Sequence, residues 1–239
     1  MNPPELPLVL RTRRFAAEVD VLRFAAPVDH VYNPLDYAGG NHEAYLTRYG
    51  RPPKRVVFLG MNPGPFGMVQ TGVPFGEIGI VRDWLRLDAA IRAPKVAYAA
   101  RPIEGFDCTR SEVSGQRLWG YLRDRFGSPE ALFRDHFVAN YCPLAFFSGA
   151  RNVTPDKLPA HEREPLFARC DAYLRDVAAL LQPQWVVGVG AFAARRAELA
   201  LAGTAIRIAQ VLHPSPASPA ANRGWAAAVD RQLADLGLA

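Results

Sequence analysis

Three polar residues, Asn62, Asn140 and His213, each follow directly after a short apolar run in this chain. An amide does not usefully titrate, so either Asn can orient a ligand or a water molecule but cannot act as a general base. The imidazole of His213 can donate a hydrogen bond to an oxygen that becomes anionic as a bond breaks. Taken singly, an Asn after a strand is most often a turn former, and a His before Pro is most often structural. The chemistry therefore depends on whether the fold brings the three together.

Apolar periodicity predicts the elements that must position these residues. Strands are predicted over 56–59, 137–139, 185–189 and 206–212, helices over 14–24, 78–87, 114–122, 167–181 and 222–236 with another starting near 191, and a long surface loop over 92–111. Strands that alternate with helices favour an α/β fold with a mostly parallel sheet covered on both faces. Right-handed crossovers would place all four strand ends, and with them Asn62, Asn140 and His213, along one edge of the sheet.

The segment after the first strand, Gly60–Gly76, holds five glycines and three prolines. In open α/β sheets, ligands bind just beyond the carboxyl ends of the strands. A stiff wall at that place, carrying the amide of Asn62 and the ring of Phe75, predicts a pocket for a flat polar ligand.

Gly188 and Gly190 resemble the start of a dinucleotide-binding G-x-G-x-x-G pattern. However, Ala193 stands at the third glycine position, and no acidic residue follows about 20 positions later. Close packing between a strand and a helix accounts for these glycines better. A Rossmann-type dinucleotide enzyme is therefore disfavoured.

The composition is that of one globular domain over residues 1–239. Hydrophobic residues make up 49% of the chain and charged residues 21%, and no apolar run approaches the length that spans a bilayer. The first residues lack the pattern of a secretory signal, so we expect a cytoplasmic protein without membrane association. We also expect a monomer. The three cysteines are well separated and form no C-x-x-C pair, which argues against a metal or iron–sulfur site, and we expect no cofactor. The net charge of +5 is compatible with a polyanionic partner.

Two long motifs carry a family resemblance. Residues 60–68 are Gly-Met-Asn-Pro-Gly-Pro-Phe-Gly-Met and residues 70–77 are Gln-Thr-Gly-Val-Pro-Phe-Gly-Glu, while residues 213–216 are His-Pro-Ser-Pro, followed by Pro219, Ala221-Asn222 and Gly224-Trp225. They resemble the two motifs of the single-strand-selective monofunctional uracil-DNA glycosylases. The similarity extends from about Tyr32 almost to the C-terminus and includes 81–84, 111–115, 140–144 and 186–190.

The resemblance implies a three-layer α/β/α fold around a central four-stranded parallel sheet. It also implies a base-excision-repair enzyme that acts on single- and double-stranded DNA. Such an enzyme flips uracil, and 5-substituted uracils, out of the strand and hydrolyses the N-glycosidic bond, which leaves an abasic site.

The same resemblance implies roles for the site residues. Asn62 would position the attacking water, and His213 would stabilise the negative charge that develops at uracil O2. Phe75 would stack on the flipped base. Asn140 would read the Watson–Crick edge, because an amide NH2 can donate to O4 while the carbonyl accepts from N3–H. The pocket would be lined by Met61, Gly64 and Met68, and the DNA would lie against Pro214, Ser215, Pro216, Ala217, Ser218 and Asn222.

Position 217 departs from the family pattern. Relatives carry a bulky basic residue there that wedges into the duplex where the base has left, whereas this chain has Ala217 followed by Ser218. A small side chain fills the vacated space poorly, and unstacking costs least for mismatched or unpaired bases. The sequence therefore predicts a preference for single-stranded or U·G substrates over a U·A duplex.

A bifunctional glycosylase/lyase would need an amine nucleophile at the site. The chain has three lysines: Lys54 precedes the first strand, at the opposite end of the sheet, and Lys95 and Lys157 are predicted in loops. The sequence therefore predicts monofunctional chemistry. Two other functions stay open, a non-catalytic nucleobase- or nucleotide-binding protein and a mismatch-specific uracil glycosylase, whose first motif also carries an Asn.

Overall fold

The computed structural model describes residues 5–238. Residues 1–4 and 239 lie outside the described residues. The expectation of no secretory signal rests on the first residues of the chain, and most of these lie outside the described part. In the part of the chain described, no helix combines the length and hydropathy needed to cross a bilayer.

The helices are α1 (Pro7–Asp20), α2 (Pro34–Tyr37), α3 (Gly39–Tyr49), α4 (Met68–Thr71), α5 (Val113–Phe126), α6 (Pro129–Asp135), α7 (Ala160–Leu181), α8 (Ala191–Ala200), α9 (Pro219–Asn222) and α10 (Trp225–Asp235). A π-helical turn, η1 (Ile80–Trp84), and two 3-10 turns, η2 (Gly105–Asp107) and η3 (Pro155–Lys157), accompany them. The strands are β1 (His30–Tyr32), β2 (Val56–Gly60), β3 (His136–Asn140), β4 (Ala145–Ser148), β5 (Arg151–Val153), β6 (Trp185–Val189) and β7 (Arg207–Val211).

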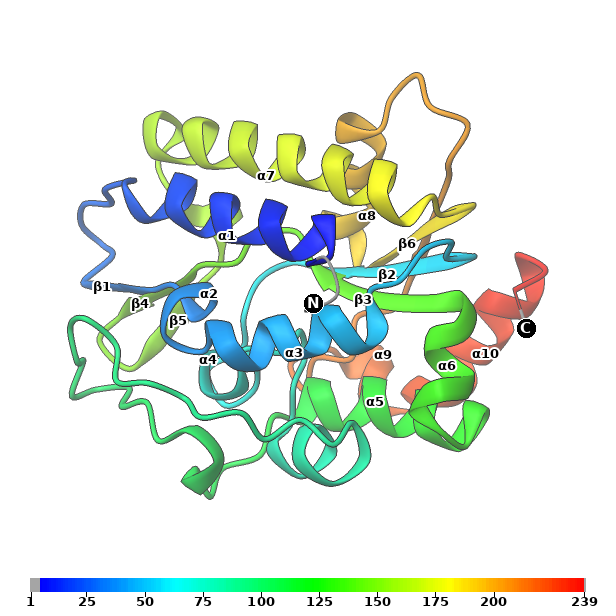
Figure 1. Cartoon of the computed structure of the whole chain (residues 1–239), viewed down its shortest axis with the longest axis horizontal. Helices are drawn as coiled ribbons and strands as arrows, with labels where there is room; N and C mark the ends of the chain where they lie inside the picture. Colours follow the sequence, from blue (N-terminus) through cyan, green and yellow to red (C-terminus); the bar gives the residue numbers. More distant parts are fainter. Residues whose placement is uncertain (1–4, 239) are drawn as a thin grey trace.

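The main sheet has the strand order β3-β2-β6-β7, and all its neighbouring strands run parallel. Every residue of β2 is buried, as expected of a strand covered on both faces. Figure 1 shows α1, α7 and α8 above the sheet and α3, α5, α6 and α10 below it. The prediction of a three-layer α/β/α fold with a four-stranded parallel sheet is therefore confirmed.

A second, antiparallel sheet of order β1-β4-β5 was not predicted. Its strands have only three or four residues, too few to show a period in the sequence. Since β4 begins five residues after β3 ends, the short segment 141–144 is held between the two sheets. That segment borders the site described below.

Several predicted helix boundaries were wrong. α1 begins at Pro7 rather than at 14, because Pro suits the first turn and the buried side chains of Leu8 and Val9 continue the apolar stripe. α7 begins at 160 rather than 167, although its early turns include Pro165. The predicted C-terminal helix is broken at Gly224, whose φ of 123° is not helical, so its first residues belong to α9 instead. The predicted loop over 92–111 holds only the turn η2.

Candidate active site

The ends of the central strands bring the first two predicted residues together. Gly60, the last residue of β2, pairs directly with Asn140, the last residue of β3. Beyond the strands, the backbone N–H of Cys142 donates to the carbonyl of Met61 at 2.9 Å, and Asn62 Nδ2 lies 3.5 Å from the carbonyl oxygen of Leu144. The segments 60–62 and 140–144 therefore continue side by side past the sheet edge.

Asn140 presents an unpaired acceptor at this edge. Its Oδ1 is buried and has no hydrogen-bond partner, while Nδ2 donates to Met68 Sδ at 3.2 Å and keeps a second hydrogen. Because buried amide oxygens are almost always paired, the orphaned oxygen at the end of this strand is an acceptor that a bound ligand can use. Only glycine fits at position 60, since a Cβ there would overlap Asn140 Oδ1 and the ring of Phe75.

Phe75 is held in an unusual backbone conformation with φ of 54°, which costs a bulky residue on the order of 1–3 kcal/mol. Contacts from α5 maintain it: Trp119 Nε1 donates to the carbonyl of Pro74 at 3.1 Å, and Gly115 leaves room for the Phe75 carbonyl oxygen. The Phe75 ring centroid lies 6.3 Å from that of His213, with the planes inclined at 44°. Strain maintained in this way is typical of functional sites.

His213 is arranged to donate a hydrogen bond through Nε2. Its Nδ1 accepts from the backbone N–H of Ser215 at 3.0 Å, so in the neutral ring the proton is on Nε2. Burial lowers the pKa of His213, which favours the neutral form. Gly190, with φ of 97°, lies against the imidazole, and a Cβ at that position would come within 3.1 Å of His213 Cβ.

The other glycine of this pair, Gly188, packs against α8, because a Cβ there would overlap the backbone of Ala194. The interpretation of both glycines as close-packing residues is therefore confirmed for Gly188. Gly190 has the additional effect of making room for the imidazole of His213.

The loop from Gly64 to Met68 rests on Glu112, which the sequence analysis gave no role. Glu112 Oε2 accepts from the backbone N–H of Phe66 at 3.3 Å, and a Cβ on Gly64 would overlap the same oxygen. Burial raises the pKa of the Glu112 carboxyl, and the bonds it accepts from backbone N–H groups oppose that rise. This buried side chain thus fixes the backbone of the loop from behind.

Two arginines of the long 92–111 loop flank the same segment. The guanidinium carbons of Arg101 and Arg110 lie 5.1 Å and 3.9 Å from the ring centroid of Phe66. These are cation–π distances, and they place positive charge beside the loop. Sequence reasoning missed both residues because the loop shows no periodicity that would place it near residue 66.

The segment after β7 is held by its own polar groups. Ser215 Oγ accepts from the N–H of Ala217 at 3.1 Å, Ser218 Oγ caps α9, and Asn222 Nδ2 donates to the carbonyl of Pro216 at 2.9 Å. Pro216 and Ala217 are exposed at its apex, whereas Pro214 is buried. The polar residues predicted to touch DNA therefore also shape this loop.

Each of the three lysines contacts groups other than Asn62 and His213. Lys54 is buried before β2, where its Nζ donates to the carbonyl of Phe133, and burial lowers its pKa to about 8. Lys95 forms ion pairs with Asp20 and Asp36 at 2.8 and 2.9 Å. Lys157 ends the turn η3 rather than lying in an irregular loop, so that detail of the prediction was wrong.

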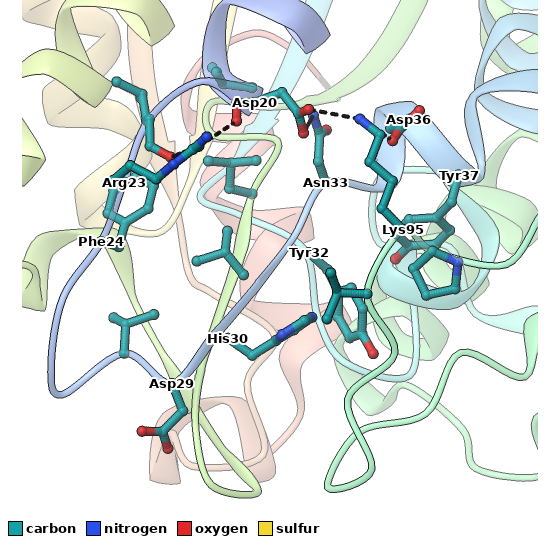
Figure 2. Close-up of a pocket in the computed structure, with 17 residues that line it drawn as sticks. Asp20, Arg23, Phe24, Asp29, His30, Tyr32, Asn33, Asp36, Tyr37 and Lys95 are labelled. Carbon is teal, nitrogen blue, oxygen red and sulfur yellow. Dashed lines mark hydrogen bonds and ion pairs between the residues drawn. The ribbon is translucent and has the colours of Figure 1, made fainter.

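A separate cavity of about 440 Å³ lies between α1, β1 and the segment around Lys95. Figure 2 shows Lys95 reaching Asp20 and Asp36, whereas the carboxylate of Asp29 lies apart from them. None of the predicted site residues lines it. The cavity nevertheless touches the site indirectly, because Leu144 borders it and also faces Asn62.

Comparisons with known proteins bear on the family of the chain. A model of the Uracil DNA glycosylase superfamily matches residues 47–236. The single-strand selective monofunctional uracil-DNA glycosylase of Rattus norvegicus is 50% identical over 228 residues, which cover 94% of this chain and 82% of that protein. The corresponding Bos taurus protein is also 50% identical, over 94% of this chain and 84% of its own.

The crystal structure of wild-type SMUG2 from Pedobacter heparinus has the same fold, with a TM-score of 0.69 and 16% sequence identity, covering 96% of this chain and 97% of that one. The fold, the match to the family model and the extended identity agree. This chain belongs to the single-strand selective monofunctional uracil-DNA glycosylase family, within the uracil DNA glycosylase superfamily.

Proposed function

We propose that this protein excises uracil from DNA in base excision repair, with the flipped base bound between Asn140, Phe75 and His213. It is a uracil-DNA glycosylase without lyase activity. The observation that supports these residue roles best is the buried, unpaired Oδ1 of Asn140, on the same strand-end edge as the imidazole of His213 with its proton on Nε2.

Recognition of the base follows from the donors and acceptors of Asn140. Its free Oδ1 accepts from uracil N3–H, and the second hydrogen of Nδ2 donates to O4. Cytosine carries an acceptor at N3 and a donor at its exocyclic amine, so it would leave both groups of the buried amide mispaired. The ring of Phe75 stacks on the base, while Met61, Gly64 and Met68 bound the pocket and receive 5-substituents.

Cleavage breaks the bond between uracil N1 and the sugar C1′. The bonding electrons move into the uracil ring, and His213 Nε2–H donates to O2 as negative charge accumulates there. A water held by Asn62 adds its oxygen to C1′ of the oxocarbenium-like sugar, and the proton it releases neutralises the uracil anion directly or through solvent. The products are free uracil and an abasic site, and no covalent enzyme intermediate forms.

The DNA lies against the loop from Pro214 to Asn222, whose exposed apex is Pro216 and Ala217. The enzyme acts as a monomer on single- and double-stranded DNA. Because Ala217 is a small apex residue, single-stranded and U·G substrates are preferred.

The test is to incubate the protein, without added metal, with a labelled uracil-containing single strand or with the same strand in a U·G duplex, and then treat half of each sample with alkali. We expect strand breaks only after alkali, because an abasic site is the product. Binding without any alkali-labile product would support a nucleobase-binding protein instead. Cleavage confined to U·G duplexes would support a mismatch-specific enzyme.

A further inference from the structure

We propose that Arg117 is a positioning residue that sets the tautomer and orientation of His213 through a single peptide group. The proposal rests on the function assigned to His213 above. Arg117 is a half-buried residue of α5, and its guanidinium points at the loop that follows β7. It lies almost a hundred positions before that loop in the sequence, so no local pattern could have indicated the contact.

The guanidinium makes three hydrogen bonds to this loop. Nη1 donates to the carbonyl oxygens of Pro214 at 3.0 Å and Ser215 at 3.4 Å, and Nη2 donates to Asn222 Oδ1 at 2.8 Å. A planar guanidinium with donors in a fixed fork can hold several acceptors at once, which a flexible ammonium cannot do equally well. Arg117 therefore fixes the loop at two separate points.

The first of these points connects directly to the imidazole. The carbonyl of Pro214 and the N–H of Ser215 belong to the same peptide group, and that N–H donates to His213 Nδ1 at 3.0 Å. A cation bound at the oxygen of an amide withdraws electron density and makes its N–H a stronger donor. The chain guanidinium–peptide–imidazole thus keeps Nδ1 an acceptor and leaves the proton on Nε2, the nitrogen that faces the leaving base.

The second point supports the DNA-facing part of the loop. Asn222, held by Arg117 Nη2, donates in turn to the carbonyl of Pro216, beside the exposed Ala217. One side chain on α5 therefore fixes both the catalytic imidazole and the apex of the loop. The position of the His213 imidazole relative to the loop apex thus depends on Arg117.

The proposal is tested with Arg117→Met, which keeps an unbranched apolar stem but removes the charge and the donors. In the free protein, long-range ¹H–¹⁵N NMR of the imidazoles reports which nitrogen of His213 carries the proton. We expect a single Nε2–H tautomer in the wild type and a mixture in the variant. On single-stranded uracil DNA, single-turnover cleavage at saturating enzyme should fall about tenfold, the loss expected when a charge-assisted bond that orients a catalytic group is removed.

Arg125→Met is the matched control, because Arg125 lies on the same helix and pairs with Asp230 at 2.9 Å, away from the loop. It should cost stability but leave the His213 spectrum and the cleavage rate unchanged. Arg117→Lys keeps the charge but replaces the planar fork of donors with a flexible ammonium, so relative to Arg117→Met it should recover part of the Nε2–H tautomer and part of the cleavage rate.

A folded Arg117→Met protein with the wild-type His213 tautomer and the wild-type rate would overturn the proposal. If that variant does not fold, the NMR spectrum of the wild type still tests the proposal. A mixture of His213 tautomers in the wild type would contradict the claim that Arg117 keeps the proton on Nε2. The NMR measurement needs no activity. Failure of the proposed function, seen as no uracil release by the wild type, is therefore distinguishable from failure of this inference.

Discussion

At the scale of single residues, His213 is the group on which the chemistry depends. Asn62 and Asn140 cannot change charge, so of the three polar residues proposed to contact the base or the water only His213 titrates. Its neutral form is favoured by burial and by the bond that Nδ1 accepts from Ser215. Protonation of Nδ1 would set two N–H donors facing each other and turn the ring away from the base.

This arrangement predicts an acid-tolerant enzyme. Because the pKa of His213 is lowered from its ordinary value of about 6.5, the active neutral form persists below that pH. Cleavage of single-stranded uracil DNA should stay constant from pH 8 down to about 6.5 and decline only at lower pH. A profile of single-turnover rate against pH checks this, and an acidic limb centred above pH 6.5 would contradict it.

At the scale of elements, the central strands and their ends were predictable, because continuous apolar runs that stop at Gly, Asn or Pro are strong local signals. The antiparallel sheet β1-β4-β5 was not, since such short strands are specified by long-range pairing. The predicted site residues Asn62, Asn140, Phe75 and His213 were found at one sheet edge. Arg117 and Glu112 were missed because their contacts with the site join distant segments.

The close fit at the end of β2 can be tested by Gly60→Ala. The added methyl would displace the Asn140 amide or the Phe75 ring, so uracil cleavage should fall about tenfold or more while overpacking costs about 1–3 kcal/mol of stability. Gly120→Ala in α5 is the control, since nothing lies within 4 Å of its new methyl. That variant should gain about 0.5–1 kcal/mol and keep full activity. Equal activity of the two variants would refute the tight pocket.

His42 of α3 contacts the backbone of the segment Gly60–Gly76. Its Nδ1 contacts the carbonyl of Gly72 at 2.7 Å, and complete burial lowers its pKa to about 4. In the unfolded chain the imidazole is protonated below about pH 6.5, whereas in the folded protein it stays neutral down to about pH 4. The free energy of unfolding therefore falls as the pH decreases from about 6.5 towards 4.

His42→Gln removes this titration. Urea unfolding at pH 7 and pH 4.5 should show the wild type losing about 2–3 kcal/mol more than the variant between the two conditions. If both proteins lose the same free energy, His42 is not the source of the dependence.

At the scale of the whole molecule, strand preference depends on how the loop apex meets DNA. Ala217 is exposed and too small to occupy the space of a flipped base. Ala217→Arg should raise cleavage of a U·A duplex several-fold and change single-strand cleavage by less than about twofold, because only the duplex must be held open.

Ala220→Arg is the control for added charge, since Ala220 is also exposed but lies on α9 beyond the apex. It should strengthen binding to both substrates about equally, since phosphate attraction carries no information on base pairing. The same gain on U·A duplex from both variants would show that charge, and not the wedge position, limits duplex repair.

The most direct measurement of the central claim is the single-turnover release of free uracil from a single-stranded oligonucleotide, followed by mass spectrometry. We expect rapid release by the wild type and a rate at least about 100-fold lower for both Asn62→Ala and His213→Asn, with oligonucleotide binding retained. Wild-type rates in either variant, or no free uracil from the wild type, would contradict the assignment of this pocket.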